Sequence, residues 1–389
     1  MAKIAIIGAG IGGLALSACL RQQGIESTIY EQATAFKRVG AGIQMGPNAM
    51  KILRGLGLEG ELAKNAYSPP FLDNKDWDTG VSTFALPVGD SAEETYGAPY
   101  YMLHRADLHE LLLGLVPRDT IKLKHELVDI QLADDGPTHL VFDNGFEDDA
   151  DVVIGADGVH SLVRSSLFPH RDALFTGKVA YRTVFPTELM GELRPGPATK
   201  WWGVDRHIVI YYVSGGREIY FTTSVPDPTW TLESFSAEGS LDDLREAFRG
   251  FHPEVEAVLA ATPSVHKWAI YDRDPMDSWH VGNVALLGDS CHPMTPFMAQ
   301  GAATSMEDAV ILTRLLVRDG FDDLPATFAN YEAVRKPRTS RIQLGSRGND
   351  WLRFPTDPHW VYGYDAWTAS LDPETDGEVS VEAAQGAER

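Results

Sequence analysis

The sequence predicts an α/β protein with two domains: one built on a parallel sheet, and a smaller one rich in antiparallel strands, followed by C-terminal helices. Three observations carry this prediction. A glycine-rich turn links an apolar strand to a helix at the N-terminus, and two later apolar strands each end in glycine and aspartate. Between those two strands, β-branched and aromatic residues dominate from Tyr181 to Val225. Strands alternating with helices favour a parallel sheet, whereas a β-branched stretch with turn residues favours antiparallel pairing.

The N-terminal βαβ unit predicts a dinucleotide-binding turn. We expect a buried strand over residues 3–7, a helix over 12–23 and a second strand over 26–30. The turn after the first strand has the spacing G-x-G-x-x-G, formed by Gly8, Gly10 and Gly13. In a Rossmann-like fold these glycines allow a tight turn, close approach to a pyrophosphate, and close helix packing. Glu31 follows the second strand, where an acidic side chain binds ribose hydroxyls.

The remaining elements follow from apolar periodicity and turn residues. They are a helix over 105–116, strands over 123–132, 138–142 and 152–154, a hairpin of 207–213 with 219–225, helices over 241–251 and 254–260, a strand over 284–287, and helices over 301–317 and 327–343. Asp134-Asp135-Gly136 marks the turn between the first two of these strands. We expect the last helix to be interrupted near Pro337, because proline lacks a backbone donor.

These elements predict a discontinuous domain organisation. The ranges are 1–67, 98–175 and 268–330 for the parallel-sheet domain, 68–97 and 176–267 for the second domain, and 331–371 for a C-terminal helical segment. Residues 372–389 are acidic and poor in aromatic residues, so we expect a disordered tail.

Composition excludes several classes of function. The 389 residues are enough for two domains with separate cores. The formal net charge of −22 repels phosphate backbones and anionic lipids, so we expect neither nucleic acid nor a membrane as partner. Cys19 and Cys291 are too few for a disulfide framework or a zinc site, so we expect no bound metal and a cytoplasmic location.

A lipoprotein signal ending at Cys19 is the alternative reading of the N-terminus. The apolar run from Ile4 to Leu16 contains glycines that disfavour a signal helix, and cleavage there would remove the dinucleotide-binding turn. No apolar stretch approaches the roughly 20 residues needed to cross a bilayer. We therefore expect the N-terminus to be part of the fold.

Two further motifs place glycine and aspartate at the ends of apolar strands. The first is Asp157-Gly158, within Asp151-Val-Val-Ile-Gly-Ala-Asp-Gly, and the second is Gly288-Asp289, followed by Pro293. Open α/β sheets bind ligands beyond the carboxyl ends of their strands. Three such motifs in series predict one extended ligand site.

Together the three motifs resemble the single-component flavoprotein aromatic hydroxylases, whose fold is of the p-hydroxybenzoate hydroxylase type. The resemblance implies FAD as cofactor, with NADH or NADPH and O2 as co-substrates, and oxygen transfer through a flavin C4a-hydroperoxide. It also implies a monomer or homodimer that binds a small aromatic acid. The cofactor-binding residues it implies are Gly8, Gly10, Gly13, Glu31, Arg38, Arg105, Asp157, Gly158, Gly288, Asp289, Pro293, Gly301 and Ala302.

Within this family the chain resembles the branch that acts on hydroxylated pyridine carboxylates such as 6-hydroxynicotinate. Shared stretches include Lys200-Trp201-Trp202, Asp205-Arg206-His207 and Met298-Ala-Gln-Gly-Ala302. That resemblance implies decarboxylative hydroxylation, with simple hydroxylation of a phenolic or salicylate-like acid as the alternative. The chain departs from the branch where Gln44 and Phe297 stand for histidines, and Ala198 for a cysteine; these departures leave the substrate open.

His207 and Tyr211 are the candidate catalytic residues, and Gln44, Val209 and Phe297 are candidate pocket residues. Side chains alternate along a strand, so His207, Val209 and Tyr211 share one face of the predicted hairpin. A histidine pKa near ~6.5 suits a base or hydrogen-bond partner at neutral pH. The alternative is that His207 and Tyr211 are ordinary core residues. Gln44 and Phe297 are inferred from the resemblance alone.

Other functions use some of the same features. A flavin-dependent halogenase needs a tryptophan-rich motif with a lysine, which Trp201-Trp202-Gly203 does not match. A flavin dehydrogenase that does not insert oxygen, and a non-enzymatic nucleotide-binding protein, remain as alternatives. Cys291-His292 could be read as a nucleophile–base pair, but its position beside Pro293 favours a structural role.

Overall fold

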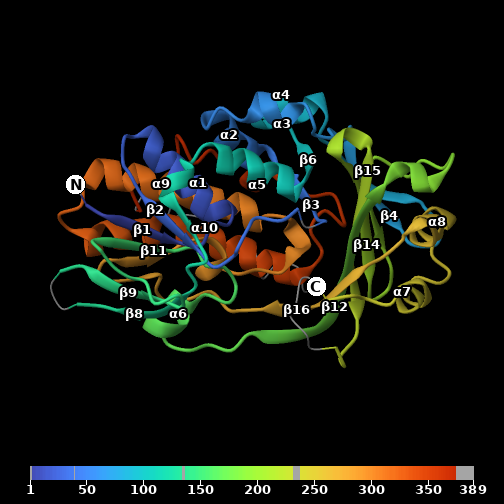
Figure 1. The fold of residues 1–389 in the computed structure, drawn as a ribbon. Helices are drawn as coiled ribbons and strands as arrows, with labels where there is room; N and C mark the ends of the chain where they lie inside the picture. Colours follow the sequence, from blue (N-terminus) through green and yellow to red (C-terminus); the bar gives the residue numbers. More distant parts are fainter. Residues whose placement is uncertain (1, 39, 134–135, 231–236, 374–389) are drawn as a thin grey trace, which may run out of the picture.

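The computed structural model describes residues 2–38, 40–133, 136–230 and 237–373. Figure 1 shows a parallel sheet with its helices at one end of the molecule and an antiparallel sheet at the other. The predicted turn residues Asp134 and Asp135 lie outside the described residues, and so does most of the predicted tail at 372–389. No helix in the described part of the chain is long and apolar enough to cross a bilayer.

The parallel sheet has six strands in the order β17-β18-β11-β1-β2-β7. Their bounds are His280–Val281 (β17), Val284–Leu286 (β18), Val152–Gly155 (β11), Ile4–Ile7 (β1), Thr28–Glu31 (β2) and Ile121–Leu123 (β7). All neighbours are parallel except β17 and β18. The three predicted motifs follow β1, β11 and β18, which are adjacent. Because parallel strands end at the same edge, the motifs meet there.

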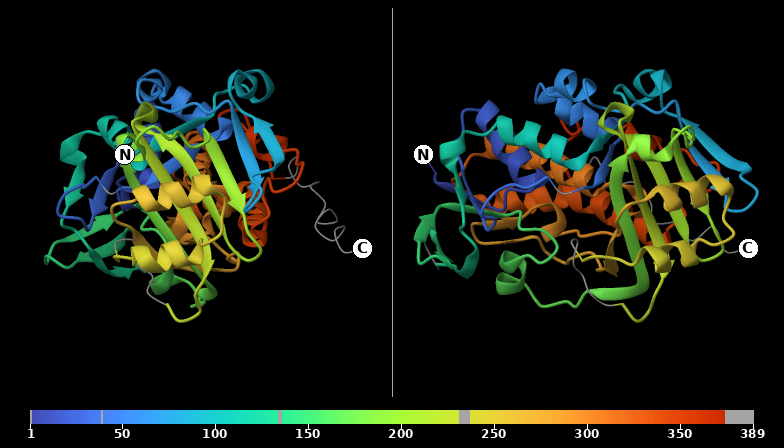
Figure 2. Two further views of the ribbon diagram at one scale, coloured as in Figure 1. Left: turned by 90° about the vertical axis from the view of Figure 1, so that its right-hand side faces the viewer. Right: turned by 45° about the vertical axis from the view of Figure 1, so that its right-hand side comes forward.

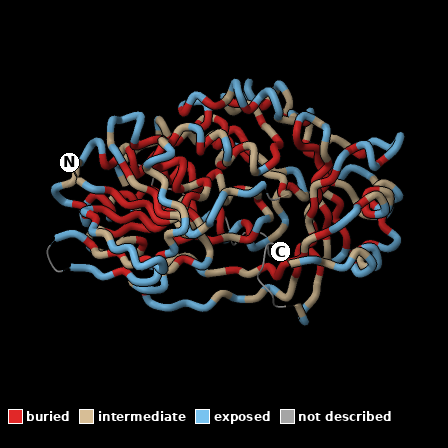
Figure 3. Tube along the Cα trace, viewed as in Figure 1, coloured by how far each residue is buried: buried red, intermediate tan, exposed pale blue. Residues whose placement is uncertain are grey.

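Helices cover one face of this sheet and a small antiparallel sheet covers the other (Figure 1). The helices are α1 (Ile11–Gln22), α5 (Arg105–Gly114), α9 (Gly301–Asp319) and α10 (Leu324–Gly348), and the small sheet consists of β8 (Leu127–Gln131), β9 (Thr138–Phe142) and β10 (Glu147–Ala150). Figure 3 shows the central strands of the parallel sheet as continuously buried chain. This burial fits the nearly uninterrupted apolar sequence of β1 and β11.

The second sheet has seven strands in the order β16-β12-β15-β14-β13-β4-β5. Their bounds are His266–Asp272 (β16), Leu174–Pro186 (β12), Glu218–Pro226 (β15), His207–Val213 (β14), Ala198–Trp202 (β13), Phe71–Asp76 (β4) and Ser82–Pro87 (β5). Helices α7 (Leu241–Ala247) and α8 (Pro253–Ala261) lie across its outer face (Figure 2). They pack on Trp201, Ile208 and Ile210, which leaves the alternate side chains for the inner face.

Several boundaries differ from the sequence-based expectation. Strand β16 crosses the expected domain boundary at residue 268, and β12 crosses the one at 175. Helix α10 continues through Pro337, so the predicted interruption is wrong. Pro337 and Ala333, whose carbonyl loses its partner, both lie on the exposed side, where water can bind that carbonyl. The predicted strand over 123–132 is divided into β7 and β8.

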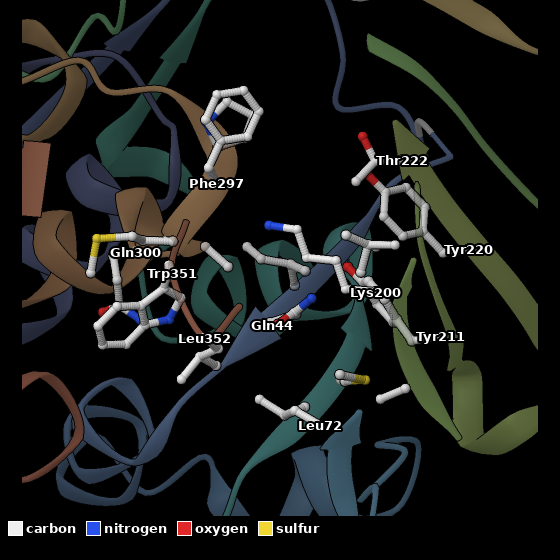
Figure 4. A pocket seen from close by; sticks show the side chains of 18 of the residues that line it. Gln44, Leu72, Lys200, Tyr211, Tyr220, Thr222, Phe297, Gln300, Trp351 and Leu352 are labelled. Carbon is white, nitrogen blue, oxygen red and sulfur yellow. The ribbon is translucent and has the colours of Figure 1, made fainter. Parts of the chain in front are cut away.

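The sequence reading also missed a connection between the two sheets. Strand β3 (Gly42–Met45) pairs with β6 (Tyr101–His104) in a two-stranded sheet. Helix α2 (Pro47–Gly55) contacts β3, and α2 in turn contacts the short helices α3 (Glu59–Ala63), α4 (Asp90–Tyr96) and α11 (His359–Tyr362). Strand β3 places Gln44 beside the inner face of the seven-stranded sheet (Figure 4).

Candidate active site

A cavity of about 320 Å³ lies between the two sheets. All five residues predicted for catalysis or the pocket line it: Gln44, His207, Val209, Tyr211 and Phe297. Three residues of the predicted cofactor set line it as well: Asp289, Gly301 and Ala302. The structure therefore brings the inner face of β14 and the start of α9 to one space (Figure 4).

His207 is buried at the edge of this cavity. Its ring lies against Phe297, with ring centroids 5.5 Å apart, and Asn349 Nδ2 lies 3.4 Å from Nδ1. Burial is the largest cause of a pKa well below the usual value, and Lys200, Lys178 and Arg353 lower it further. The ring is therefore neutral at pH 7, the form that can accept a proton, and its role as a base stays a prediction.

Tyr211 lies on the same face of β14, four residues beyond His207 with Val209 between them, and is also buried. Burial raises the pKa of its phenol well above the usual value, so the hydroxyl keeps its proton at neutral pH. Gln44 interacts with this hydroxyl, and its Oε1 accepts a hydrogen bond of 2.6 Å from the Tyr100 hydroxyl. The wall thus offers hydroxyl and amide groups between apolar surfaces.

The glycine turn after β1 fits a pyrophosphate. A Cβ on Gly8 would lie 2.5 Å from the Ala156 oxygen, and a Cβ on Gly13 2.1 Å from the Gly8 oxygen. Only glycine is compatible with these contacts. Gly10 faces open space, and no side chain caps the first turn of α1. Because no described side chain occupies them, the backbone amides of this first turn are free to bind a phosphate group.

Glu31 is fixed at the end of β2. Its two carboxylate oxygens accept hydrogen bonds of 2.8 Å from the backbone amides of Ala9 and Ala33. This holds the side chain beside the glycine turn, and the remaining lone pairs can accept from ribose hydroxyls. The geometry fits the adenosine half of a dinucleotide.

The Asp-Gly and Gly-Asp motifs are joined by Ser290. Its hydroxyl donates to Asp157 Oδ1 at 3.1 Å and accepts from the Gly158 amide at 3.0 Å. Asp157 Oδ2 also accepts from the Val163 amide, at the start of helix α6 (Leu162–Leu167). Gly288 has φ of +65°, and a Cβ there would lie 2.5 Å from Ser305 Oγ. These contacts hold the ends of β11 and β18 together.

Asp289 points to the start of α9. A Cβ on Gly301 would lie 3.7 Å from Asp289 Oδ1, and this carboxylate makes no hydrogen bond to any other described side chain or amide. Burial raises its pKa, an effect that Arg105 and other nearby cations oppose. An acceptor held in a cavity without a partner fits a ligand that donates hydroxyl groups, as a flavin ribityl chain does.

Arg38 and Pro293 lie away from the cavity lining. Arg38 is an exposed residue that pairs with Asp107 and lies 3.8 Å from Glu218. The Pro293 carbonyl accepts a hydrogen bond of 2.8 Å from Gln343 Nε2, which ties the Gly-Asp loop to α10. Their roles in binding a cofactor stay predictions.

A buried ionic network supports the cavity floor. Arg335 Nη2 lies 2.8 Å from Glu307 Oε2, and its Nε lies 2.7 Å from Asp308 Oδ1; all three side chains are fully buried. Arg338 also binds Glu307. Asn48 Nδ2 donates both to Glu307 and to Gln300, a cavity residue just before α9. The network therefore fixes the position of the α9 start.

The Cys291-His292 pair is part of this network. His292 Nε2 lies 2.6 Å from Asp308 Oδ2, and the Cys291 thiol donates to the Gly288 carbonyl at 3.3 Å. Burial raises the pKa of Cys291 well above its usual value. A thiol held in this way is a poor nucleophile, which supports the structural role expected from the sequence.

Sequence reasoning missed two cations in the cavity wall, Lys200 on β13 and Arg182 on β12. The pairing of β13 with β14 could have identified Lys200 as a cavity residue. Lys200 stands opposite Val209 in the β13–β14 ladder, with Ala198 opposite Tyr211, so these residues share the inner face. Trp351, Leu352 and Tyr362 also line the cavity, and only the tertiary fold brings them there.

The chain is similar to known proteins along most of its length. The chain matches the family described as "FAD binding domain" over residues 1–343. It is 43% identical over 371 residues to 6-hydroxynicotinate 3-monooxygenase of Bordetella bronchiseptica, covering 95% of this chain and 97% of that protein. It is 38% identical over 348 residues to 3-amino-4-hydroxybenzoate 2-monooxygenase of Streptomyces cremeus, covering 89% and 86% of the two chains.

The fold is also similar to solved structures. The crystal structure of Klebsiella pneumoniae HpxO complexed with FAD and uric acid has a TM-score of 0.80 and 27% identity. The similarity covers 92% of this chain and 90% of that one. The shared architecture therefore extends over both sheets.

Proposed function

We propose that this chain, which belongs to the FAD-dependent aromatic monooxygenases, hydroxylates a small, electron-rich aromatic or pyridine carboxylic acid. FAD is the cofactor, NAD(P)H donates electrons, and one oxygen atom of O2 enters the product. The observation that carries the substrate proposal is the cavity between the sheets, whose walls combine apolar surfaces with His207, Tyr211 and Lys200. Such a cavity suits one small ring with polar substituents.

We favour decarboxylative hydroxylation of a 6-hydroxynicotinate-like acid. In that reaction the ring carbon that carries the carboxylate gains a hydroxyl, CO2 leaves, and NAD(P)H supplies two electrons that reduce the second oxygen atom to water. Two of the similar proteins bear the name 6-hydroxynicotinate 3-monooxygenase, at 43% and 42% identity. This supports the proposal.

FAD would be held by the three motifs. Gly8, Gly10 and Glu31 would bind its adenosine and pyrophosphate, Asp289 its ribityl chain, and Gly301 and Ala302 would lie beside its ring system. When bound, FAD supplies the redox chemistry that carries electrons from NAD(P)H to O2 and an oxygen atom to the substrate ring.

The chain's own residues position the substrate and handle its proton. Phe297, Val209 and Leu352 would hold the ring and exclude water. Neutral His207 would accept a hydrogen bond from the ring hydroxyl and draw away its proton as the ring is attacked. Protonated Tyr211 would donate a hydrogen bond to a ring substituent. The pKa directions of the two side chains support these roles.

Simple ring hydroxylation of a phenolic or salicylate-like acid is the second candidate. Phe297 packs directly on His207. The resemblance implies that the pyridine-carboxylate branch has a histidine at the position of Phe297. Loss of an imidazole there reduces the hydrogen bonding available to a pyridine ring and makes the pocket more apolar. Retention of the carboxylate in the product would decide for this candidate.

Substrate-stimulated NADH oxidation with product mass analysis tests the proposal. The panel contains hydroxynicotinates, hydroxypicolinates, salicylates and aminobenzoates. We expect one acid to accelerate NADH oxidation and to yield a product with one added oxygen, with loss of CO2 for the favoured reaction. If every acid gave only hydrogen peroxide, the proposed substrate class would be wrong.

We also propose a cytoplasmic monomer or homodimer. The buried thiols of Cys19 and Cys291 and the need for NAD(P)H support a reducing compartment.

A further inference from the structure

Lys200 is a basic residue in the wall of the substrate cavity, and Asp350 is an anion whose charge acts on it without an ion pair. Lys200 stands in the middle of β13, and its side chain reaches into the space between Phe297 and the Tyr211–Tyr220 wall (Figure 4). Among the described residues its ammonium makes no ion pair or hydrogen bond; its one recorded contact is the face of Trp202, 3.9 Å from the ring centroid. A half-buried ammonium without an ion pair is costly, so a ligand that supplies an anion would stabilise it.

We propose that Lys200 is the carboxylate-binding residue of this enzyme and selects anionic aromatic acids over neutral analogues. This inference rests on the proposed aromatic-acid substrate and names the group that reads its acid function. Opposite Lys200 in the ladder is Val209, and His207 and Tyr211 flank that position on the same face. The ammonium therefore shares the cavity with the groups that would bind the ring hydroxyl.

The other charged groups that line the cavity are held by neighbouring residues or carry the wrong sign for a carboxylate. Asp73 Oδ1 accepts a hydrogen bond of 2.6 Å from the Ser82 hydroxyl, and its Oδ2 lies 3.6 Å from Lys75 Nζ. Arg182 is stacked on the Trp268 ring at 4.7 Å. Asp289 is an anion and repels a carboxylate.

The electrostatics of Lys200 couple anion binding to a proton. Burial lowers its pKa to about 7, Asp350 raises it in part, and Arg353 lowers it. A bound carboxylate raises the pKa again, so the acid binds most tightly below pH 7 and takes up a proton near neutrality. His207 does not contribute in this range, because burial and the nearby cations Lys200, Lys178 and Arg353 keep it neutral. Tyr211 and Tyr220 stay protonated, since burial raises both pKa values.

Binding measurements on the FAD-loaded enzyme test the proposal. The probe is each acid of the panel and its carboxamide, titrated against the absorption of the bound flavin from pH 6 to 9. We expect the wild-type enzyme to prefer the acid, and Lys200→Met to weaken acid binding about ten- to hundredfold while leaving amide binding within about threefold. Above pH 7 the wild-type affinity for the acid falls by up to about tenfold per pH unit.

Two variants provide controls. Lys200→Arg keeps the charge at every pH in the range, so it retains the acid preference and loses the pH dependence. Lys75→Met changes a lysine that lies over Trp201 at 5.0 Å on the neighbouring strand β4 but is not part of the cavity wall. It retains both the preference and the pH dependence.

The outcomes separate this inference from the proposed function. Equal loss of acid and amide binding in Lys200→Met, an unchanged acid preference, or a wild-type enzyme without that preference would overturn the role of Lys200. Product formation is measured independently. If an acid is hydroxylated but binds no better than its amide, the proposed function stands and the role of Lys200 is refuted. If an acid binds through Lys200 but yields no oxygenated product, the role of Lys200 stands and the proposed function is refuted.

Discussion

At the scale of single residues, the inner face of β14 carries the chemistry that the chain adds to its cofactor. His207, Val209 and Tyr211 line the cavity, whereas Ile208 and Ile210 pack against the outer helices. This alternation was predictable from the strand pattern alone. The protonation state of His207 was not, because it depends first on burial in the tertiary fold and then on Lys200, Lys178 and Arg353, of which the last two are distant in sequence.

His207→Ala and Tyr211→Phe test the two assigned roles. We expect His207→Ala to lower kcat/KM by about 100-fold, near the low end for loss of a proton acceptor. Tyr211→Phe removes one hydrogen bond and lowers it by about tenfold. Steady-state and flavin-reduction kinetics measure both effects. Unchanged values in both variants would remove these residues from the mechanism.

Tyr212→Phe is the matched control for Tyr211→Phe. Tyr212 faces the other side of β14, and its hydroxyl donates to the Pro195 carbonyl at 3.0 Å. Its removal costs about 1 kcal/mol of stability and leaves kcat/KM within about twofold.

In the wild-type enzyme, we expect the fall of kcat at acid pH to lie well below pH 6.5, because only there does His207 take up a proton and lose its function as a base.

At the scale of elements, the contact of α9 with α10 holds the cavity floor. Burial alone raises the pKa of Glu307, but Arg338 and Arg335 outweigh it and lower the pKa to about 2. The pKa of Asp308 is also lowered, because His292 and Arg335 outweigh its burial. A folded-state pKa below the unfolded value means that the stability these groups contribute is complete above about pH 5 and is lost as pH falls toward 2.

Arg335→Met tests this network. It leaves Asp308 and Glu307 buried with fewer cations, so we expect a loss of about 3–5 kcal/mol in the free energy of unfolding at pH 7. The loss becomes smaller as the pH falls below 5 and the carboxyl groups take up protons. Denaturant unfolding measured across pH gives both quantities.

Arg341→Met is the control on the same helix. Arg341 is exposed and lies over the Trp360 ring at 3.9 Å. We expect it to change stability by less than about 1 kcal/mol. If Arg335→Met unfolds the protein altogether, Glu307→Gln, which keeps the shape of the side chain, gives a milder measure of the same network. A loss below about 1 kcal/mol in both network variants would contradict its structural role.

At the scale of the whole molecule, local patterns predicted the sheets but not how they meet. The glycine turn, the two aspartate motifs and the β14–β15 hairpin are each encoded within a short stretch, and the structure contains the strands and turns expected from them. The β3–β6 pair joins residues that are far apart in the sequence, so no local pattern marks it. Lys200 was not predicted for a different reason: its strand β13 was not recognised, although it pairs with the neighbouring strand β14.

The central claim is that this enzyme inserts one oxygen atom from O2 into an aromatic acid. Mass analysis of the product formed under isotopically labelled dioxygen, with NADH and the best acid of the panel, tests it most directly. We predict one labelled oxygen atom in the ring product, and the second in water. A product that carries unlabelled oxygen, or NADH oxidation that leaves the acid unchanged, would contradict the account.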